Sequence, residues 1–418
     1  MKLALALSLL ALLTAAAGAE DFALHDGDRV VFYGDSITDQ RLYTTYTEAF
    51  VVTRFPQLKI GFVHSGWGGD RVTGGGGGPI DVRLKRDVFA YQPTVMTVML
   101  GMNDASYRPL DEPIFATYRK GYEHLIASTK QALPGVRITV LQPSPFDDFT
   151  LPPAFEGGYN GVLLRYGQFV RELAQREGLG VADLNGPVVA ALQKAQATDP
   201  AVARQLIADR VHPGPAVHLL MAAELLKSWH APAVVSAVTI DGTAGKVVES
   251  VRTKIDGLKI EGGVTWSQLD ESLPFFLKLA DPGVALAIKS SDFIQSLNQQ
   301  ILKVTGLSAA RYTLKIDAAE VGSFSREELG TGINLATLAT PMLAQAAAVE
   351  GLTWQHNNVH FQRWRSVELP LSGSSSPDVV KAVANLVTAL DQDEVRIIEQ
   401  QRAAAVPKSH SFQLVPAL

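Results

Sequence analysis

The feature that most constrains the fold of this chain is a regular alternation of short apolar runs with longer helical stretches across residues 28–230. Strands that alternate with helices in this way predict a parallel sheet with helices on both faces. Several of the runs are apolar throughout, as expected for strands that are buried on both sides. The expected strands are 29–33, 60–64, 95–100, 136–141 and 180–184, and the expected helices lie near 42–55, 80–90, 112–132, 160–177, 187–197 and 214–229.

The pattern changes after residue 230. Residues 245–275 alternate polar and apolar side chains as half-buried strands do, and 312–317 is a further strand candidate. Helical stretches follow at about 340–366 and 377–404. We therefore expect two domains, 20–230 and 231–418, and the second is an α+β appendage rather than another doubly wound unit.

Three glycine-containing segments are expected to be loops. Five consecutive glycines, Gly74 to Gly78, precede Pro79 and an expected helix, and they lack the lysine and hydroxyl residues of a phosphate-binding loop. Residues 330–334 are expected to form a second loop, and this one could rim a catalytic cleft. Residues 372–377 are expected to form a loop that also offers an N-cap to the last helix.

Residues 1–19 have the layout of a secretory signal peptide. Lys2 supplies the positive start, residues 3–13 are apolar, and Ala17-Gly18-Ala19 matches a cleavage signal before Glu20. The alternative is an uncleaved anchor helix, for which the apolar run is short. No later stretch is long and apolar enough to cross a bilayer, so we expect no stable membrane span and an exported bacterial protein, either periplasmic or extracellular.

Composition narrows the chemistry. The chain has no cysteine, which excludes disulfides, thiol catalysis and thiolate metal sites. With 418 residues, of which 47% are hydrophobic, it can build its core without cross-links. Its net charge of −5 offers no basic excess for a phosphate backbone, so nucleic acid is not an expected partner.

Four short blocks carry residues that are suited to catalysis. They are Gly34-Asp35-Ser36, Gly68-Gly69-Asp70, Gly101-Met102-Asn103-Asp104 and Asp209-Arg210-Val211-His212. Ser36 and Asn103 come just after expected strands, and ligands of parallel sheets bind beyond the carboxyl ends of the strands. We therefore expect these blocks to meet at one edge of the sheet.

Ester hydrolysis needs a nucleophile, a base, a group that orients the base, and donors for the developing oxyanion. Ser36 is the candidate nucleophile, His212 the base, and Asp209 lies three residues away to orient it. Asn103 offers a side-chain amide and Gly69 a backbone N–H. Each residue also has an ordinary structural interpretation: a helix cap, a loop histidine, a polar helix end, a turn residue and a glycine with positive φ.

The four blocks, in this order, resemble those of the SGNH (GDSL) hydrolases, and the resemblance covers about residues 27–230. It implies a flavodoxin-like three-layer α/β/α sandwich with a five-stranded parallel sheet. It also implies Ser36 as nucleophile, His212 as base and Asp209 as its partner. The oxyanion hole would consist of the Ser36 and Gly69 N–H groups and the Asn103 amide, with no metal and no organic cofactor.

The second block departs from the family pattern. His64 stands where the family often has Asn, and Arg71 stands where it often has Thr or Ser. This departure leaves open whether Gly68 or Gly69 supplies the oxyanion donor, and Gly69 matches better by its position before Asp70.

Candidate substrate contacts are Asp35, beside the serine, and Trp354 and Arg365 in the second half, where a ring could stack on a sugar. The alternative for the aromatic residues is packing between the two halves. His356 and His360 share a helical face at metal-ligand spacing, but no acidic third ligand is evident nearby and the H-E-x-x-H pattern is absent. We therefore predict no metal site.

The sequence favours an exported serine ester hydrolase that works through an acyl-enzyme. The expected substrate is a small-molecule or polysaccharide ester, which would make the protein a carbohydrate O-acetylesterase or a short-chain carboxylesterase. Two alternatives stay open: a lipid-directed lysophospholipase or thioesterase, and a non-catalytic carbohydrate-binding module on the same scaffold.

Overall fold

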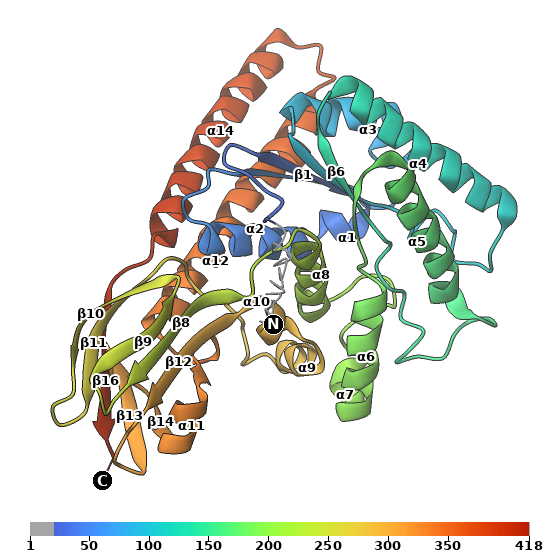
Figure 1. Cartoon of the computed structure of the whole chain (residues 1–418). Coiled ribbons are helices and arrows are strands. Elements are labelled where there is room, and N and C mark those ends of the chain that lie inside the picture. Colours follow the sequence, from blue (N-terminus) through green and yellow to red (C-terminus); the bar gives the residue numbers. More distant parts are fainter. Residues whose placement is uncertain (1–20, 418) are drawn as a thin grey trace, which may run out of the picture.

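The computed structural model describes residues 21–417, so the predicted signal peptide lies outside the described residues. The first half of the chain forms a five-stranded parallel sheet with the strand order β2-β1-β5-β6-β7 (Figure 1). Its strands are β1 (Arg29–Gly34), β2 (Gly61–Gly66), β5 (Val95–Met99), β6 (Arg137–Leu141) and β7 (Gly180–Ala182). All five lie within a few residues of the expected strands, and the predicted α/β fold class is confirmed.

Helices cover both faces of this sheet. On one face, α3 (Ile80–Asp87), α4 (Glu112–Ala132) and α5 (Gly158–Glu177) pack side by side. On the other, α2 (Leu42–Arg54) packs against α8 (Pro215–Ser228). The apolar strand residues fill the space between, and Val30 to Tyr33 of β1 are fully buried. Helix α6 (Gly186–Thr198) packs on α8.

The second half contains two further sheets, which lie at the lower left of Figure 1. One has the order β15-β12-β8-β9 and the other β10-β11-β16-β13-β14. The strands are β8 (Val234–Asp241), β9 (Lys246–Val251), β10 (Thr253–Lys259), β11 (Val264–Asp270), β12 (Gln299–Thr305), β13 (Arg311–Ile316), β14 (Ala319–Ser325), β15 (Ile333–Asn334) and β16 (His410–Pro416). Apolar side chains of both sheets, such as Ile240, Trp266 and Leu302, share one core.

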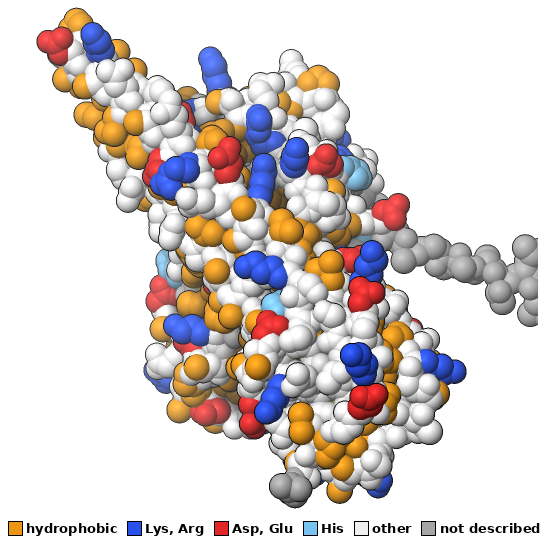
Figure 2. All heavy atoms as spheres, turned by 90° about the vertical axis from the view of Figure 1, so that its left-hand side faces the viewer, with side chains coloured by type: hydrophobic (Ala, Val, Ile, Leu, Met, Phe, Trp, Pro, Cys, Tyr) orange, Lys and Arg blue, Asp and Glu red, His pale blue; other side chains and the backbone are white. Residues whose placement is uncertain are grey.

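Long helices lead the chain back to the α/β half. Helix α12 (Pro341–Phe361) continues through a π-helical segment (Gln362–Glu368) into α13 (Leu369–Leu371), and α14 (Pro377–Ala405) returns beside it. Both α12 and α14 pack on α2. The start of α14 projects from the body, and its exposed side chains include Val379, Val380 and Leu386 (Figures 1 and 2).

Two expectations on loops need correction. Residues 330–334 are not a loop, because α11 (Arg326–Thr331) ends there and β15 pairs with β12 at the edge of a sheet. The glycine run is not an open loop either, since β3 (Gly74–Gly75) and β4 (Gly78–Pro79) form a small antiparallel pair. The expected loop before the last helix is present, and Ser376 stands at the N-cap of α14, although its side chain makes no capping hydrogen bond.

Among residues 21–417, no helix combines the length and the apolar character that crossing a membrane requires.

Candidate active site

Ser36 lies at the carboxyl edge of the sheet, one turn beyond β1. Asp35 caps the short helix α1 (Ser36–Asp39), and its carboxylate accepts the Ile37 N–H at 3.0 Å. Ser36 is therefore the first residue of α1, where backbone N–H groups have no partner within the helix. Asp35 is only 1% exposed, and burial raises its pKa to about 8. Its side chain shapes the turn and has no surface to offer, which argues against the expected substrate contact.

His212 connects Ser36 to Asp209. Its Nε2 lies 2.9 Å from Ser36 Oγ and its Nδ1 lies 2.7 Å from Asp209 Oδ2. The second carboxylate oxygen, Oδ1, accepts the backbone N–H groups of Val211 at 2.9 Å and His212 at 2.7 Å. Partial burial alone would raise the pKa of Asp209, but the hydrogen bonds from His212 outweigh it and hold the pKa below its usual value. A proton on Nδ1 then leaves Nε2 free to accept from the serine hydroxyl.

The histidine loop is anchored to the segment that follows β6. Arg210 adopts a left-handed conformation (φ +71°), and its carbonyl accepts the Asp147 N–H at 2.9 Å. Its guanidinium donates to Pro152 O at 2.9 Å and lies 3.6 Å from Asp148. These contacts fix the entry to α8 and with it the position of His212.

Three hydrogen-bond donors without a partner in the described chain follow neighbouring strands. The backbone N–H groups of Ser36, after β1, and Gly69, after β2, donate to no residue among 21–417. Gly69 has φ +77°, a conformation that favours glycine. Asn103, after β5, donates one amide hydrogen to Asp70 O at 3.0 Å, which leaves the second amide hydrogen available.

Two contacts outside the predicted set hold the donor loops in place. The Tyr107 hydroxyl donates to Asn103 Oδ1 at 3.0 Å, so the nitrogen end of that amide is fixed. Asp104 accepts the Val72 N–H at 2.9 Å and ties the loop after β5 to the loop after β2. Burial raises the pKa of Asp104 to about 7. Sequence reasoning missed Tyr107 because Ser106 and Tyr107 both have positive φ, which no side-chain periodicity signals.

The paired side chains of His212 and Asp209 are open to solvent. The side chain of His212 is 37% exposed and that of Asp209 is 57% exposed. A molecule bound at Ser36 can therefore extend beyond the site into solvent.

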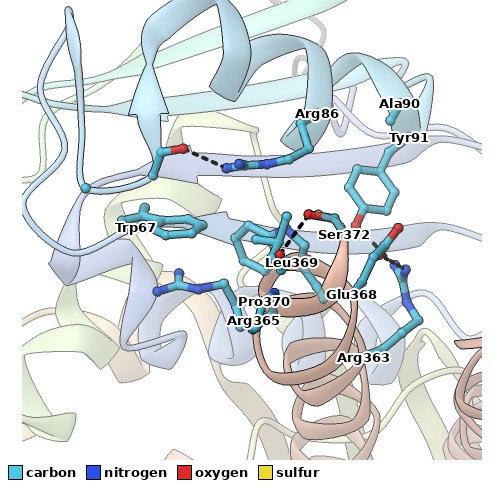
Figure 3. Close-up of a pocket in the computed structure, with 13 residues that line it drawn as sticks. Trp67, Arg86, Ala90, Tyr91, Arg363, Arg365, Glu368, Leu369, Pro370 and Ser372 are labelled. Carbon is cyan, nitrogen blue, oxygen red and sulfur yellow. Dashed lines mark hydrogen bonds and ion pairs between the residues drawn. The ribbon is translucent and has the colours of Figure 1, made fainter. Parts of the chain in front are cut away.

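Trp354 and Arg365, the two expected substrate contacts of the second half, lie in different places. Trp354 packs edge-on against Tyr46 of α2, with ring centroids 6.3 Å apart, and belongs to the core of the α/β half rather than to the serine site. Arg365 lies over the ring of Trp67, the residue that precedes Gly68 of the second block, with its Cζ 3.6 Å from the ring centroid (Figure 3).

His356 and His360 face two carboxylates, whereas the sequence had suggested that none was near. His356 Nε2 lies 2.5 Å from Glu48 Oε1, and Glu394 lies 3.6 Å from both histidines. Across residues 21–417, no group of three or more histidine or carboxylate side chains has the arrangement of a metal site.

A serine hydroxyl, an imidazole and a carboxylate in line at the edge of an α/β sheet, beside three free donors, define the class of SGNH ester hydrolases. Residues 32–220 match the GDSL-like Lipase/Acylhydrolase family, and this part of the chain is a domain of that family. The protein is accordingly an ester hydrolase.

The chain is also similar to two known proteins. An acetylxylan esterase from Geobacillus stearothermophilus is 26% identical over 227 residues, which make up 48% of this chain and 93% of that relative. The solved structure of a gut microbial diltiazem-metabolizing enzyme is 28% identical and superposes with a TM-score of 0.79. That match covers 94% of this chain and 98% of the other, so the likeness extends through the second half.

Proposed function

We propose that this protein is an exported serine esterase that removes short acyl groups, foremost acetyl groups on carbohydrates, through an acyl-enzyme. The observation that carries the proposal is the line of contacts from Ser36 Oγ through the His212 ring to Asp209, at 2.9 and 2.7 Å. Distances of this size allow proton transfer without rearrangement.

In the proposed mechanism, Ser36 Oγ attacks the ester carbonyl while His212 Nε2 takes the hydroxyl proton. Asp209 stabilises the imidazolium that forms. The N–H groups of Ser36 and Gly69 and the Asn103 amide bind the oxyanion of the tetrahedral intermediate. His212 then protonates the leaving alcohol, and the acyl group stays on Ser36. Water, activated by the same histidine, releases the acid and restores the serine.

The substrate class rests on two arguments. The exposure of His212 and Asp209 suits an ester on a large or polymeric molecule, because little of the substrate has to be enclosed. One relative is named as an acetylxylan esterase, and the similarity extends over 93% of that relative's own length. Together they favour acetyl groups on an oligosaccharide or polysaccharide over long acyl chains.

The test is a turnover panel of acetylated xylo-oligosaccharides, 4-nitrophenyl esters of increasing chain length and lysophospholipids. We expect hydrolysis of the acetyl esters and its loss in Ser36→Ala, with Ser228→Ala on α8 as a matched control. A preference for long-chain esters would replace the substrate class with a lipid. Sugar binding without turnover or fluorophosphonate labelling at Ser36 would turn the assignment into a binding module.

Export and domain roles are part of the proposal. We propose that residues 1–19 are removed as a signal peptide, that 20–230 carry the chemistry and that 231–418 support it. The amino-terminal sequence of the protein recovered from the periplasm or medium of a bacterial host tests the first point. Cleavage before Glu20 is expected, and retention of Met1 in the exported protein would contradict it.

A further inference from the structure

Arg365 reaches from the second half of the chain to the loop that carries Gly69. It lies in the π-helical segment after α12, and its guanidinium covers the Trp67 ring at 3.6 Å. Its Nη1 donates to the Gly66 carbonyl and to Asp39 Oδ1, each at 3.3 Å. Figure 3 shows Arg365 and Arg86 on either side of the Trp67 ring, at the wall of a cavity of about 780 Å³.

Asp39 relays this contact to the donor loop. It is the last residue of α1, the helix that begins at Ser36, and its Oδ2 accepts the Gly68 N–H at 3.1 Å. One carboxylate thus binds Arg365 with one oxygen and the residue before Gly69 with the other. The side chains of Arg365 and Asp39 are only 19% and 21% exposed, which strengthens a charged contact relative to one in open water.

The loop is already tightly fitted to α1. A Cβ atom on Gly66 would lie 2.2 Å from the Asp39 backbone nitrogen, so only glycine allows this approach. The Trp67 N–H donates to Gly34 O at 3.0 Å, one residue before Asp35. Small shifts of Asp39 therefore move the loop and not merely a side chain.

Charge supports the same arrangement. Burial raises the pKa of Asp39, and Arg365 is the strongest influence that opposes the rise. The arginine therefore favours the ionised carboxylate, which is the better acceptor for the Gly68 N–H.

We propose that Arg365 is a positioning residue for the oxyanion loop, acting through Asp39 and Gly68 on the Gly69 N–H. The inference rests on the proposed function of Gly69. It gives the second half of the chain a defined part in the reaction, because that half supplies a residue that holds the loop without touching the substrate. It also replaces the expected role of Arg365 as a direct substrate contact.

The experiment compares Arg365→Met, Arg365→Lys and Asp39→Asn with the wild type on 4-nitrophenyl acetate. Loss of the contact loosens one donor without removing it, so Arg365→Met and Asp39→Asn should each lower kcat about tenfold, less than full loss of an oxyanion donor. KM should stay within about twofold, because the ground-state contacts are unchanged. Arg365→Lys should keep part of the kcat that Arg365→Met loses. The double variant Arg365→Met/Asp39→Asn should have a kcat no lower than that of Asp39→Asn alone.

Arg363→Met is the matched control. Arg363 lies in the same π-helical segment and lines the same cavity, but it pairs with Glu368 and Asp391 instead of the donor loop. Its kcat should equal that of the wild type.

Amide hydrogen exchange gives a readout that does not depend on turnover. Exchange in the peptide that covers residues 66–70 should be faster in Arg365→Met and Asp39→Asn than in the wild type and Arg363→Met. Should Arg365→Met fail to fold, Asp39→Asn decides both measurements.

Three results would overturn the inference: a wild-type kcat in both variants, a raised KM with unchanged kcat, or multiplicative losses in the double variant. These three results count against the inference only if Ser36→Ala is inactive, because only then does the measured turnover come from the proposed site. A Ser36→Ala variant as active as the wild type would instead end the proposed function, and the exchange of residues 66–70 would still report on the Arg365 contact.

Discussion

The amide of Asn103 has two different ends, and only its nitrogen can stabilise an oxyanion. The Tyr107 hydroxyl donates to the oxygen end at 3.0 Å, which makes the flipped orientation unfavourable. Tyr107 is held in turn by stacking on Tyr159, with ring centroids 5.0 Å apart. A tyrosine outside the four blocks thus sets the direction of a candidate oxyanion donor.

We expect Tyr107→Phe to lower kcat about 2- to 10-fold with little change in KM, which corresponds to one neutral hydrogen bond of roughly 0.5–1.5 kcal/mol. The phenyl ring keeps the stacking on Tyr159. Steady-state kinetics on an acetyl ester measure the effect. Tyr122→Phe, which removes a hydroxyl bound to Val98 O, is the control and should leave kcat unchanged. A Tyr107→Phe variant with wild-type kcat would show that the amide is oriented without the phenol.

Asp209→Asn tests the orientation of His212. The amide keeps the shape of the side chain but favours the wrong imidazole tautomer, and this change costs about 10⁴-fold in kcat in a buried triad. Because Asp209 is 57% exposed, water can replace part of its role, and we expect a loss on the order of 10²- to 10⁴-fold. A loss below about threefold, measured on the same ester, would assign Asp209 to loop structure alone.

Sequence reasoning located most residues of the candidate site but not their supports. Ser36, His212 and Asp209 come together as the block order suggested, because the ends of parallel strands share one edge. The contact between Arg365 and Asp39 joins residues 326 positions apart, which no local pattern can reveal. Asp35 shows the reverse case, since its place beside the serine suggested a contact that its burial argues against.

At the scale of elements, a buried charged cluster joins α2 to α12 and α14. Glu48 on α2 binds His356 at 2.5 Å and His64 at 3.3 Å, and Gln401 on α14 donates to it at 2.9 Å. Burial alone would raise the pKa of Glu48, but the charge of His356 lowers it to about 2. Burial alone would lower the pKa of His356, but the charge of Glu48 raises it to about 9. The pKa of His64 is instead lowered by burial to about 4.

Glu394 lies 3.6 Å from His356. Burial alone would raise the pKa of Glu394, but hydrogen bonds from His356 and His360 lower it to about 2. Near neutral pH the His356 cation therefore lies between two anions, Glu48 and Glu394.

The pair of Glu48 and His356 makes the free energy of unfolding depend on pH in both directions. The pKa of Glu48 in the folded state lies below its usual 4.5, so its contribution to stability is present above that pH and is lost as pH falls toward about 2. The pKa of His356 in the folded state lies above its usual 6.5, so its contribution to stability is complete below that pH and is lost as pH rises through about 9.

We expect His356→Gln to reduce the free energy of unfolding by roughly 3–5 kcal/mol at about pH 6, as when one partner of a buried pair is removed. The difference from the wild type should shrink as pH rises through about 9. Urea unfolding of both proteins across this range measures it. A difference that stays constant up to about pH 10 would mean that His356 is not a cation in the folded protein.

Element boundaries were predictable in the first half and less so in the second. The first half follows hydrophobic periodicity, which specifies strands and helices locally. Strand β16 was missed because it is stabilised by pairing with β11 and β13, about 100 residues or more earlier in the chain. The segment 330–334 looked like a loop because of its glycines, and it is a paired strand edge because β12 lies beside it.

At the scale of the whole molecule, the two halves share structure beyond the Arg365 contact. Apolar residues of α9 (Pro282–Ser290) and α10 (Phe293–Leu297) belong to the core of the α/β half. Arg54 of α2 is buried and donates to Pro232 O at 2.5 Å and Leu297 O at 2.8 Å. The second half therefore contributes to the stability of the first.

We expect heat to unfold the chain in one cooperative transition, with equal calorimetric and van't Hoff enthalpies. Arg54→Met should lower the free energy of unfolding by about 2–6 kcal/mol, because it leaves two buried carbonyl groups without donors at roughly 1–3 kcal/mol each. Differential scanning calorimetry tests both points. Two separate transitions, with esterase activity surviving the first, would show that the halves are independent.

The most direct test of the central claim is the mass of the protein trapped during turnover of 4-nitrophenyl acetate. Acid quenching followed by peptide mapping should find one acetyl group on Ser36 of the wild type and none in Ser36→Ala, which should also lose turnover. Full turnover in Ser36→Ala, or an acetyl group carried by another residue of the active enzyme, would contradict the account.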